Sequence, residues 1–124
     1  MQREVISSAS VPPSGLPFSP ALKVGNWVFL SGQAAHASDG SVPATIEEQT
    51  ELTLSNVAAL LEAAGAAMTD VVSVMVHLTD IEEFGAYNQV YQRFFPEPRP
   101  TRTTVQAVLV GTLKIEITVV AHID

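Results

Sequence analysis

Two charged side chains near the end of the sequence are the first candidates for chemistry. Arg102 stands between small threonines in residues 100–105, and Glu116 follows inside residues 114–117. An arginine presents a planar pair of N–H donors that can bind a small carboxylate through two parallel hydrogen bonds. A glutamate nearby can orient a water molecule and accept its proton. Together, the two residues suggest hydrolysis of a small anionic substrate.

A two-residue alternation predicts strands at about 102–110 and 113–121 to carry these side chains. In the second strand, apolar residues face one way, and Lys114, Glu116 and Thr118 face the other. We expect the two strands to be neighbours, with Arg102 and Glu116 in one cleft. Lys114 is the rival partner of Glu116, and a structural salt bridge or an exposed strand charge is the alternative role for Arg102.

The remaining elements follow from capping and turn residues. Thr45 and Glu48 form a capping box for a helix that should end at Gly65. Asp80 and Glu83 begin a second helix, which carries aromatic residues at helical spacing until Pro96. Four strand segments complete this pattern: residues 3–7, 22–24, 27–31 and 71–78. Residues 1–20 otherwise form an irregular, proline-rich segment.

This order of elements predicts one α+β domain over residues 1–124, with a mixed sheet and two helices on one sheet face. Val72, Val74, Val76 and Leu78 are too apolar to leave the other face in water. Sheets from several subunits could cover it. We also interpret Phe18, Trp27, Tyr87 and Tyr91 as core residues.

The composition limits the class of protein. With 124 residues, 47% of them apolar, a single globular domain is expected. The net charge of -7 disfavours nucleic acid as a partner, and Arg93 and Arg99 are interpreted as exposed surface charges. We find no cysteine, no metal-ligand spacing among His36, His77 and His122, and no glycine-rich phosphate loop, so no cofactor is expected. We expect neither a signal peptide nor a membrane span, and therefore a cytoplasmic protein.

Several short sequence motifs indicate a family resemblance. They are Gly25-Asn26 with Ser31-Gly32-Gln33, Asn56-Val57 with Glu62-Ala63-Ala64-Gly65, Phe84 with Asn88, Tyr91, Phe94 and Phe95, and Pro100-Thr101-Arg102 through Ile115-Glu116-Ile117. From about Ser14 to Ala121 the chain resembles the Rid family of reactive-intermediate deaminases, also called YjgF/UK114 proteins.

The resemblance implies a chorismate-mutase-like α+β domain assembled as a homotrimer, with clefts between subunits. It implies that Arg102 holds the substrate carboxylate and Glu116 positions the attacking water. Ser31 and Gly32 would line the cleft, with Asn88 and Phe18 nearby. The substrates would be 2-imino or enamine acids such as 2-aminoacrylate, hydrolysed to 2-keto acids and ammonia without a metal or cofactor.

Two differences from the family pattern concern the pocket wall. Phe18 stands where many members have tyrosine, and Thr104 replaces a cysteine of the best-known subgroup. We expect Ser31, Gly32 and Thr104 to shape the cleft. Two alternatives stay open: a binding or chaperone-like protein without turnover, and deamination of a larger unsaturated amino acid in a catabolic pathway.

Overall fold

The computed structural model describes residues 2–124, so Met1 of the irregular N-terminal segment lies outside it. The strands are β1 (Arg3–Ile6), β2 (Ala21–Val24), β3 (Trp27–Leu30), β4 (Val71–Leu78), β5 (Thr101–Gln106) and β6 (Ile115–His122). The α-helices are α1 (Ile46–Ala63) and α2 (Phe84–Phe94), with short 3-10 turns before β4 and α2.

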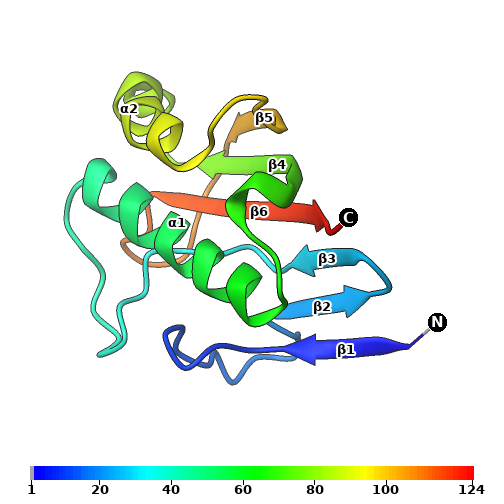
Figure 1. Cartoon of the computed structure of the whole chain (residues 1–124). Coiled ribbons are helices and arrows are strands. Elements are labelled where there is room, and N and C mark those ends of the chain that lie inside the picture. Colours follow the sequence, from blue (N-terminus) through cyan, green and yellow to red (C-terminus); the bar gives the residue numbers. More distant parts are fainter. Residues whose placement is uncertain (1) are drawn as a thin grey trace.

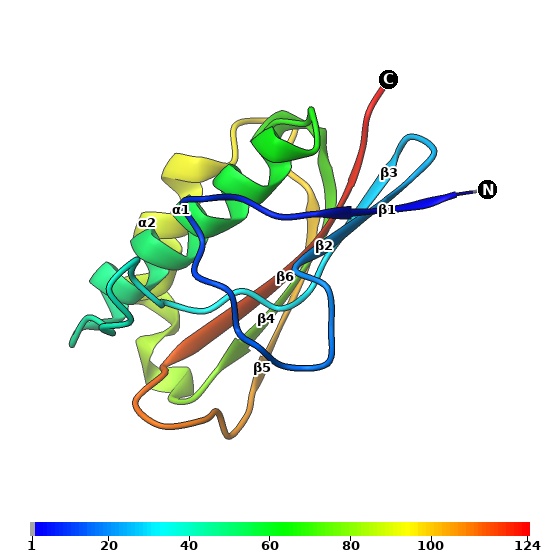
Figure 2. The same cartoon turned by 90° about the horizontal axis from the view of Figure 1, so that it is seen from below.

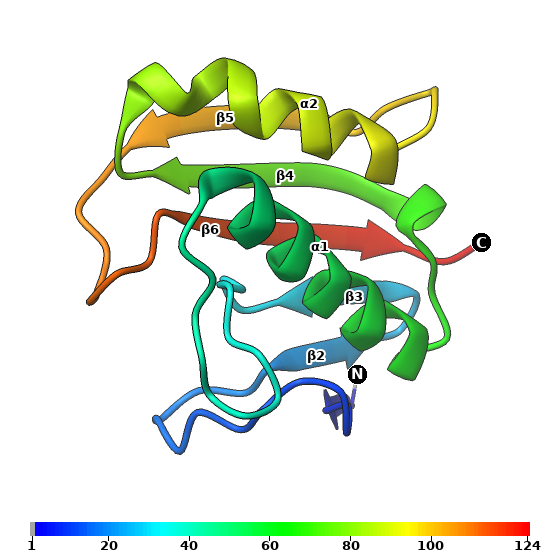
Figure 3. The same cartoon turned by 90° about the vertical axis from the view of Figure 1, so that its left-hand side faces the viewer.

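The six strands form one mixed sheet in the order β1-β2-β3-β6-β4-β5. The β4–β5 pair is parallel and is connected through α2, whereas the other pairs are antiparallel. Figure 1 and Figure 2 show α1 and α2 on the same side of the sheet, and Figure 3 views that side, with α2 alongside β5 and α1 running obliquely in front of β6 and β3. This confirms the expected α+β domain with its helices on one face.

Helix α1 begins and ends where its capping residues predict. The Thr45 Oγ1 atom accepts the Glu48 N–H at 3.1 Å and donates to the Glu48 carboxylate at 2.9 Å. At the other end, Gly65 takes a positive φ of 82°, a conformation that glycine adopts without steric cost. The predicted stripe on α1 is buried and packs on the sheet; it comprises Thr53, Val57, Leu60, Leu61 and Ala64.

Strand β4 differs from the prediction in which side chains face the helices. Val74, Val76 and Leu78 are buried on the helix side, while Met75 and Val72 are exposed. A register irregularity between Val71 and Ser73 explains why Val72 does not follow the alternation. The expectation that Val74, Val76 and Leu78 face away from the helices is therefore wrong.

The face opposite the helices is nevertheless apolar at several positions. Trp27, Phe29, Met75 and Val105 are each exposed by about two fifths of their surface: 44%, 45%, 39% and 40%. These residues come from three different strands, so their side chains are spread over much of the sheet. Several exposed apolar side chains on one sheet face are typical of a surface that binds another protein chain.

The strands that carry Arg102 and Glu116 are shorter than predicted. Residues 107–114 form a loop, because β5 can pair only as far as the end of β4 at Leu78. The last bond between the two segments runs from the Ala107 N–H to the Leu78 carbonyl, at 2.9 Å. The buried Gln49 side chain fixes this loop to α1. Its amide donates to the carbonyls of Pro43 and Thr112, and its oxygen accepts the Lys114 N–H.

Candidate functional site

Arg102 lies on β5 and faces α2. Strand residues two apart share a face, so Arg102 and Thr104 both point to the helix side, where their β4 neighbours Val74 and Val76 are buried. The Arg102 Nη1 atom donates a 2.6 Å hydrogen bond to the Asn88 Oδ1 atom on α2. This contact uses one edge of the guanidinium and leaves the other N–H groups for a ligand.

Three aromatic rings of α2 surround the Arg102 guanidinium. Its central carbon lies 4.7 Å from the ring centroid of Tyr91, 5.2 Å from that of Tyr87 and 5.6 Å from that of Phe84. Such cation–π contacts stabilise a partly desolvated guanidinium by about 1 kcal/mol or more each. The cation is therefore held in one place before any ligand arrives.

The two tyrosines stay neutral beside this cation. Burial raises the pKa of Tyr91 to about 12, although the positive charge of Arg102 acts in the opposite direction. Burial also raises the pKa of Tyr87, whose hydroxyl forms a hydrogen bond with the hydroxyl of Thr104. The hydroxyl of Thr104 is thus positioned by α2 as well as by its own strand.

Glu116 is held by a different set of residues, on the other face of the sheet. Ile115 and Ile117 are buried against the helices, so Glu116 between them points the opposite way. Its side chain packs directly over Gly32. A Cβ atom placed on Gly32 would lie 2.8 Å from the Glu116 Cδ atom and 3.0 Å from its Cγ atom, so this approach requires glycine.

Ser31 connects this group to the N-terminal loop. Its hydroxyl donates to the Ser19 carbonyl at 2.7 Å, and its N–H donates to the Pro20 carbonyl at 3.0 Å. These bonds fasten the proline-rich segment that carries Phe18 to the end of β3. Phe18 is half exposed and Trp27 is 44% exposed, so the prediction that these two are core residues is wrong. The same prediction is confirmed for Tyr87 and Tyr91, which are buried.

The sheet separates the predicted site residues into two groups. We call Asn88, Arg102 and Thr104 the arginine group, and Phe18, Ser31, Gly32 and Glu116 the glutamate group. The prediction that the strands of Arg102 and Glu116 are neighbours is wrong, because β4 lies between β5 and β6. The reason is topological: α2 returns the chain to pair β5 in parallel with β4, and β6 then occupies the opposite side of β4.

Over residues 9–123, the chain matches the family model described as Endoribonuclease L-PSP. The chain belongs to this Rid/YjgF family. It is 44% identical over 107 residues to the mitochondrial protein mmf2 of Schizosaccharomyces pombe, covering 86% of this chain and 84% of that protein. It is 37% identical over 124 residues to the chloroplastic Reactive Intermediate Deaminase A of Arabidopsis thaliana, covering 98% of this chain and 66% of that protein.

Solved structures of the family have the same fold. The crystal structure of E. coli TdcF with bound serine superposes with a TM-score of 0.92 at 33% identity, covering 98% of this chain and 99% of that one. The family resemblance and the fold expected from it are therefore confirmed. Within residues 2–124 of this Rid protein, no helix has the length and apolar character to cross a membrane.

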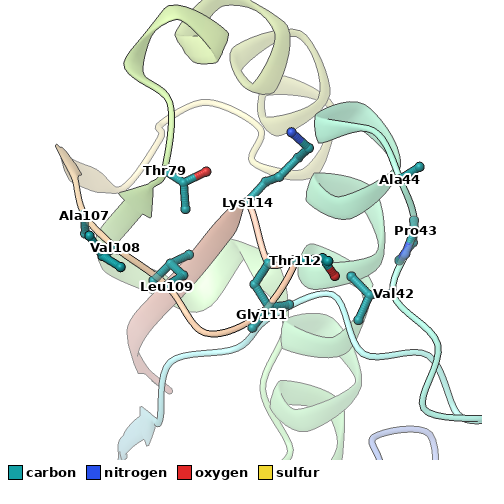
Figure 4. A pocket seen from close by; sticks show the side chains of 11 residues that line it. Val42, Pro43, Ala44, Thr79, Ala107, Val108, Leu109, Gly111, Thr112 and Lys114 are labelled. Atoms are coloured by element: carbon teal, nitrogen blue, oxygen red, sulfur yellow. The ribbon is translucent and has the colours of Figure 1, made fainter.

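Two of the surface recesses formed by residues 2–124 differ in whether predicted site residues line them. The larger, about 760 Å³, lies between the 107–114 loop and residues 42–44 (Figure 4). Of the predicted site residues, all of which lie within residues 2–124, none lines it. The smaller recess, about 310 Å³, is lined by Arg102 and Asn88 together with Arg99. Of the two recesses, the smaller one is therefore the one that contains predicted site residues.

Lys114, the rival partner of Glu116, belongs to the larger recess. Its Nζ atom lies 3.7 Å from the Glu83 carboxylate rather than beside Glu116. Asp80 accepts the Glu82 N–H and so caps the 3-10 turn Ile81–Glu83, and Glu83 makes no side-chain capping bond at the start of α2, so the predicted capping box of Asp80 and Glu83 is wrong. The alternative pairing of Lys114 with Glu116 is therefore excluded.

Sequence reasoning identified the helix that holds Arg102 but missed what that helix does. Tyr87 and Tyr91 are interpreted as core residues, and with Phe84 their spacing matches one helix face. Asn88 follows Phe84 by four positions and precedes Tyr91 by three, so it shares that face. A polar amide among aromatic residues on one face was the available signal for a guanidinium binding site.

Proposed function

We propose that this Rid protein hydrolyses small 2-imino and enamine acids to 2-keto acids and ammonia, at sites formed between two subunits. The observation that supports this most directly is the caged guanidinium of Arg102, with donors left over for a carboxylate. The membership of the family, which contains a relative named Reactive Intermediate Deaminase A and a serine-bound structure of TdcF, is consistent with an amino-acid-like ligand. The net charge of -7 disfavours an RNA substrate, because phosphates would be repelled.

The proposed chemistry needs one cation, one carboxylate and one water. Arg102 binds the substrate carboxylate and fixes the imine carbon. The imine binds with its nitrogen already protonated. Glu116 accepts a proton from water as the water oxygen forms a bond to the imine carbon, and the nitrogen takes up the electron pair of the C=N bond. Glu116 passes this proton to the amino group of the resulting carbinolamine, and the C–N bond breaks as ammonia leaves. The hydroxyl proton then returns to Glu116 as the water oxygen becomes the keto oxygen.

One chain cannot bring both groups to one substrate, because they lie on opposite faces of its sheet. A second copy resolves this if the β5 edge of one subunit approaches the open face of the next. The two contacting surfaces would then differ, and such heterologous contacts close into rings. Three copies make the trimer implied by the family resemblance, and the apolar open face at Trp27, Phe29 and Met75 would supply buried area.

Complementation between two inactive variants tests this arrangement. We expect Arg102→Ala and Glu116→Gln each to abolish release of keto acid from an imino acid made in situ by an amino-acid oxidase. Unfolding the two variants together and refolding them creates interfaces in which both native residues meet. With random association, about one quarter of interfaces are intact, so about one quarter of wild-type activity should return.

The controls separate assembly from chemistry. Each variant refolded alone must stay inactive, and size-exclusion chromatography must show the same oligomer for all samples. Arg93→Ala, which removes an exposed arginine outside the small recess, should retain full activity. A mixture that recovers no activity while the oligomer is intact would contradict a site shared between subunits.

Two alternatives give different results in the same assays. A binding or chaperone-like protein would bind keto acids but hydrolyse none of the imines tested. A deaminase of larger unsaturated amino acids would show rates that rise with side-chain size across a panel of imines. Phe18 in place of tyrosine and Thr104 in place of cysteine are the wall residues that would admit larger groups.

A further inference from the structure

The recess beside Arg102 contains a second arginine that the proposed reaction does not use. Arg99 and Arg102 both line it, with Asn88, Gln92, Tyr91 and Pro100. Among these lining residues, all within the described part of the chain, the charged side chains are both cations. The protein as a whole has thirteen acidic and six basic residues, so the recess reverses the overall charge locally.

A hydrogen bond from the Arg99 side chain to the backbone orients Arg99 at the recess. Its Nε atom donates a 3.0 Å hydrogen bond to the Phe95 carbonyl at the end of α2. Its Nη1 atom lies 3.5 Å from the Glu97 carboxylate, but both side chains are exposed, at 46% and 81%. Water screens an exposed pair of this kind, so it contributes little and a ligand can replace it.

The spacing of the two arginines suits one short ligand. Three residues span at most about 10 Å of extended chain, and both side chains are long enough to converge on the recess between them. Arg102 is only partly buried at this point, with one edge occupied by Asn88. A ligand with two carboxylates can therefore contact one guanidinium with each.

We propose that Arg99 and Arg102 bind dianionic acids, and that imines of four- and five-carbon dicarboxylic acids are substrates. This inference rests on the proposed function for the role of Arg102 at the carboxylate next to the imine. Arg99 binds the distal carboxylate, which takes no part in the reaction. Hydrolysis is otherwise as above: water supplies the keto oxygen and the imine nitrogen leaves as ammonia.

Binding of stable product analogues tests the site without any catalysis. Isothermal titration calorimetry compares 2-oxoglutarate, with two carboxylates, and 2-oxobutanoate, with one, on the wild-type oligomer and on Arg99→Gln. We expect Arg99→Gln to weaken 2-oxoglutarate binding about tenfold, as for loss of one charge-assisted hydrogen-bonding partner, and to leave 2-oxobutanoate within about twofold. Arg93→Gln is the matched control, because it removes the same charge outside the recess.

A kinetic measurement extends the test to the reaction. Imines generated from glutamate and from 2-aminobutyrate by amino-acid oxidases give kcat/KM for a dianionic and a monoanionic substrate. The ratio of the two values should fall about tenfold in Arg99→Gln and stay constant in Arg93→Gln.

Three results would overturn the inference. They are equal losses for both keto acids in Arg99→Gln, no loss for either, and no binding of 2-oxoglutarate to the wild-type protein. A different result separates it from the proposed function. If Arg99→Gln weakens 2-oxoglutarate selectively but no imine is hydrolysed by the wild-type protein, the two-arginine site is upheld and the deaminase proposal fails.

Discussion

Replacing Gly32 by alanine should displace the proposed catalytic carboxylate while the protein still folds. A Cβ atom at position 32 would lie 2.8 Å from the Glu116 Cδ atom, whereas nonbonded carbon atoms are normally about 3.5 Å apart or more. The carboxyl group must therefore move by roughly 0.7 Å or more. Because Cγ is also too close, at 3.0 Å, a rotation at the carboxylate end alone does not relieve the clash.

The expected effect on activity is large. Misplacing a reacting group by about 1 Å costs roughly a hundredfold in rate, so kcat/KM of Gly32→Ala should fall by one to two orders of magnitude. The loss of folding free energy should be about 1–2 kcal/mol, as for modest overpacking. Gly85→Ala is the matched control, since a Cβ atom there meets nothing within 4 Å. It should keep wild-type activity.

A double-mutant cycle shows whether the effect acts through Glu116. In a Glu116→Ala background, the three closest atoms to the new methyl group are gone, so Gly32→Ala should cause no additional loss of stability. Activity is measured as keto-acid formation in the oxidase-coupled assay, and stability by urea unfolding. A Gly32→Ala protein with kcat/KM within about twofold of wild type would refute the proposal that the position of Glu116 matters.

Two further predictions concern the arginine group. Asn88→Ala removes the acceptor of the Arg102 Nη1 hydrogen bond, so KM should rise about tenfold with a smaller change in kcat; unchanged steady-state kinetics would contradict this role. The Tyr91 pKa of about 12 means that the folded protein keeps a proton that the unfolded chain loses near pH 10. Protonated Tyr91 therefore contributes roughly 3 kcal/mol to the free energy of unfolding. This contribution is complete below about pH 10 and is lost as the pH rises to about 12. Urea unfolding between pH 9 and 11 should show a weaker pH dependence in Tyr91→Phe, and an identical dependence would exclude Tyr91 as its source.

Local signals in the sequence were sufficient for most elements of the fold. The Thr45 cap, Gly65 and Pro96 define helix ends through hydrogen bonds and steric limits that act within a few residues. The alternation around Glu116 correctly predicted which β6 side chains are buried. The end of β5 could not be predicted in this way, because it depends on where its neighbour β4 ends.

The sequence by itself determined the family, the α+β architecture and the residue types available for chemistry, because motifs, caps and hydrophobic periods are written in consecutive residues. Tertiary structure alone decided that β4 separates Arg102 from Glu116, and that α2 supplies the aromatic cage around the guanidinium. The order of strands in a sheet depends on how connections cross over, and a two-residue period is the same for any order. For this reason the sequence singled out the two candidate groups, and the fold showed that a single chain keeps them apart.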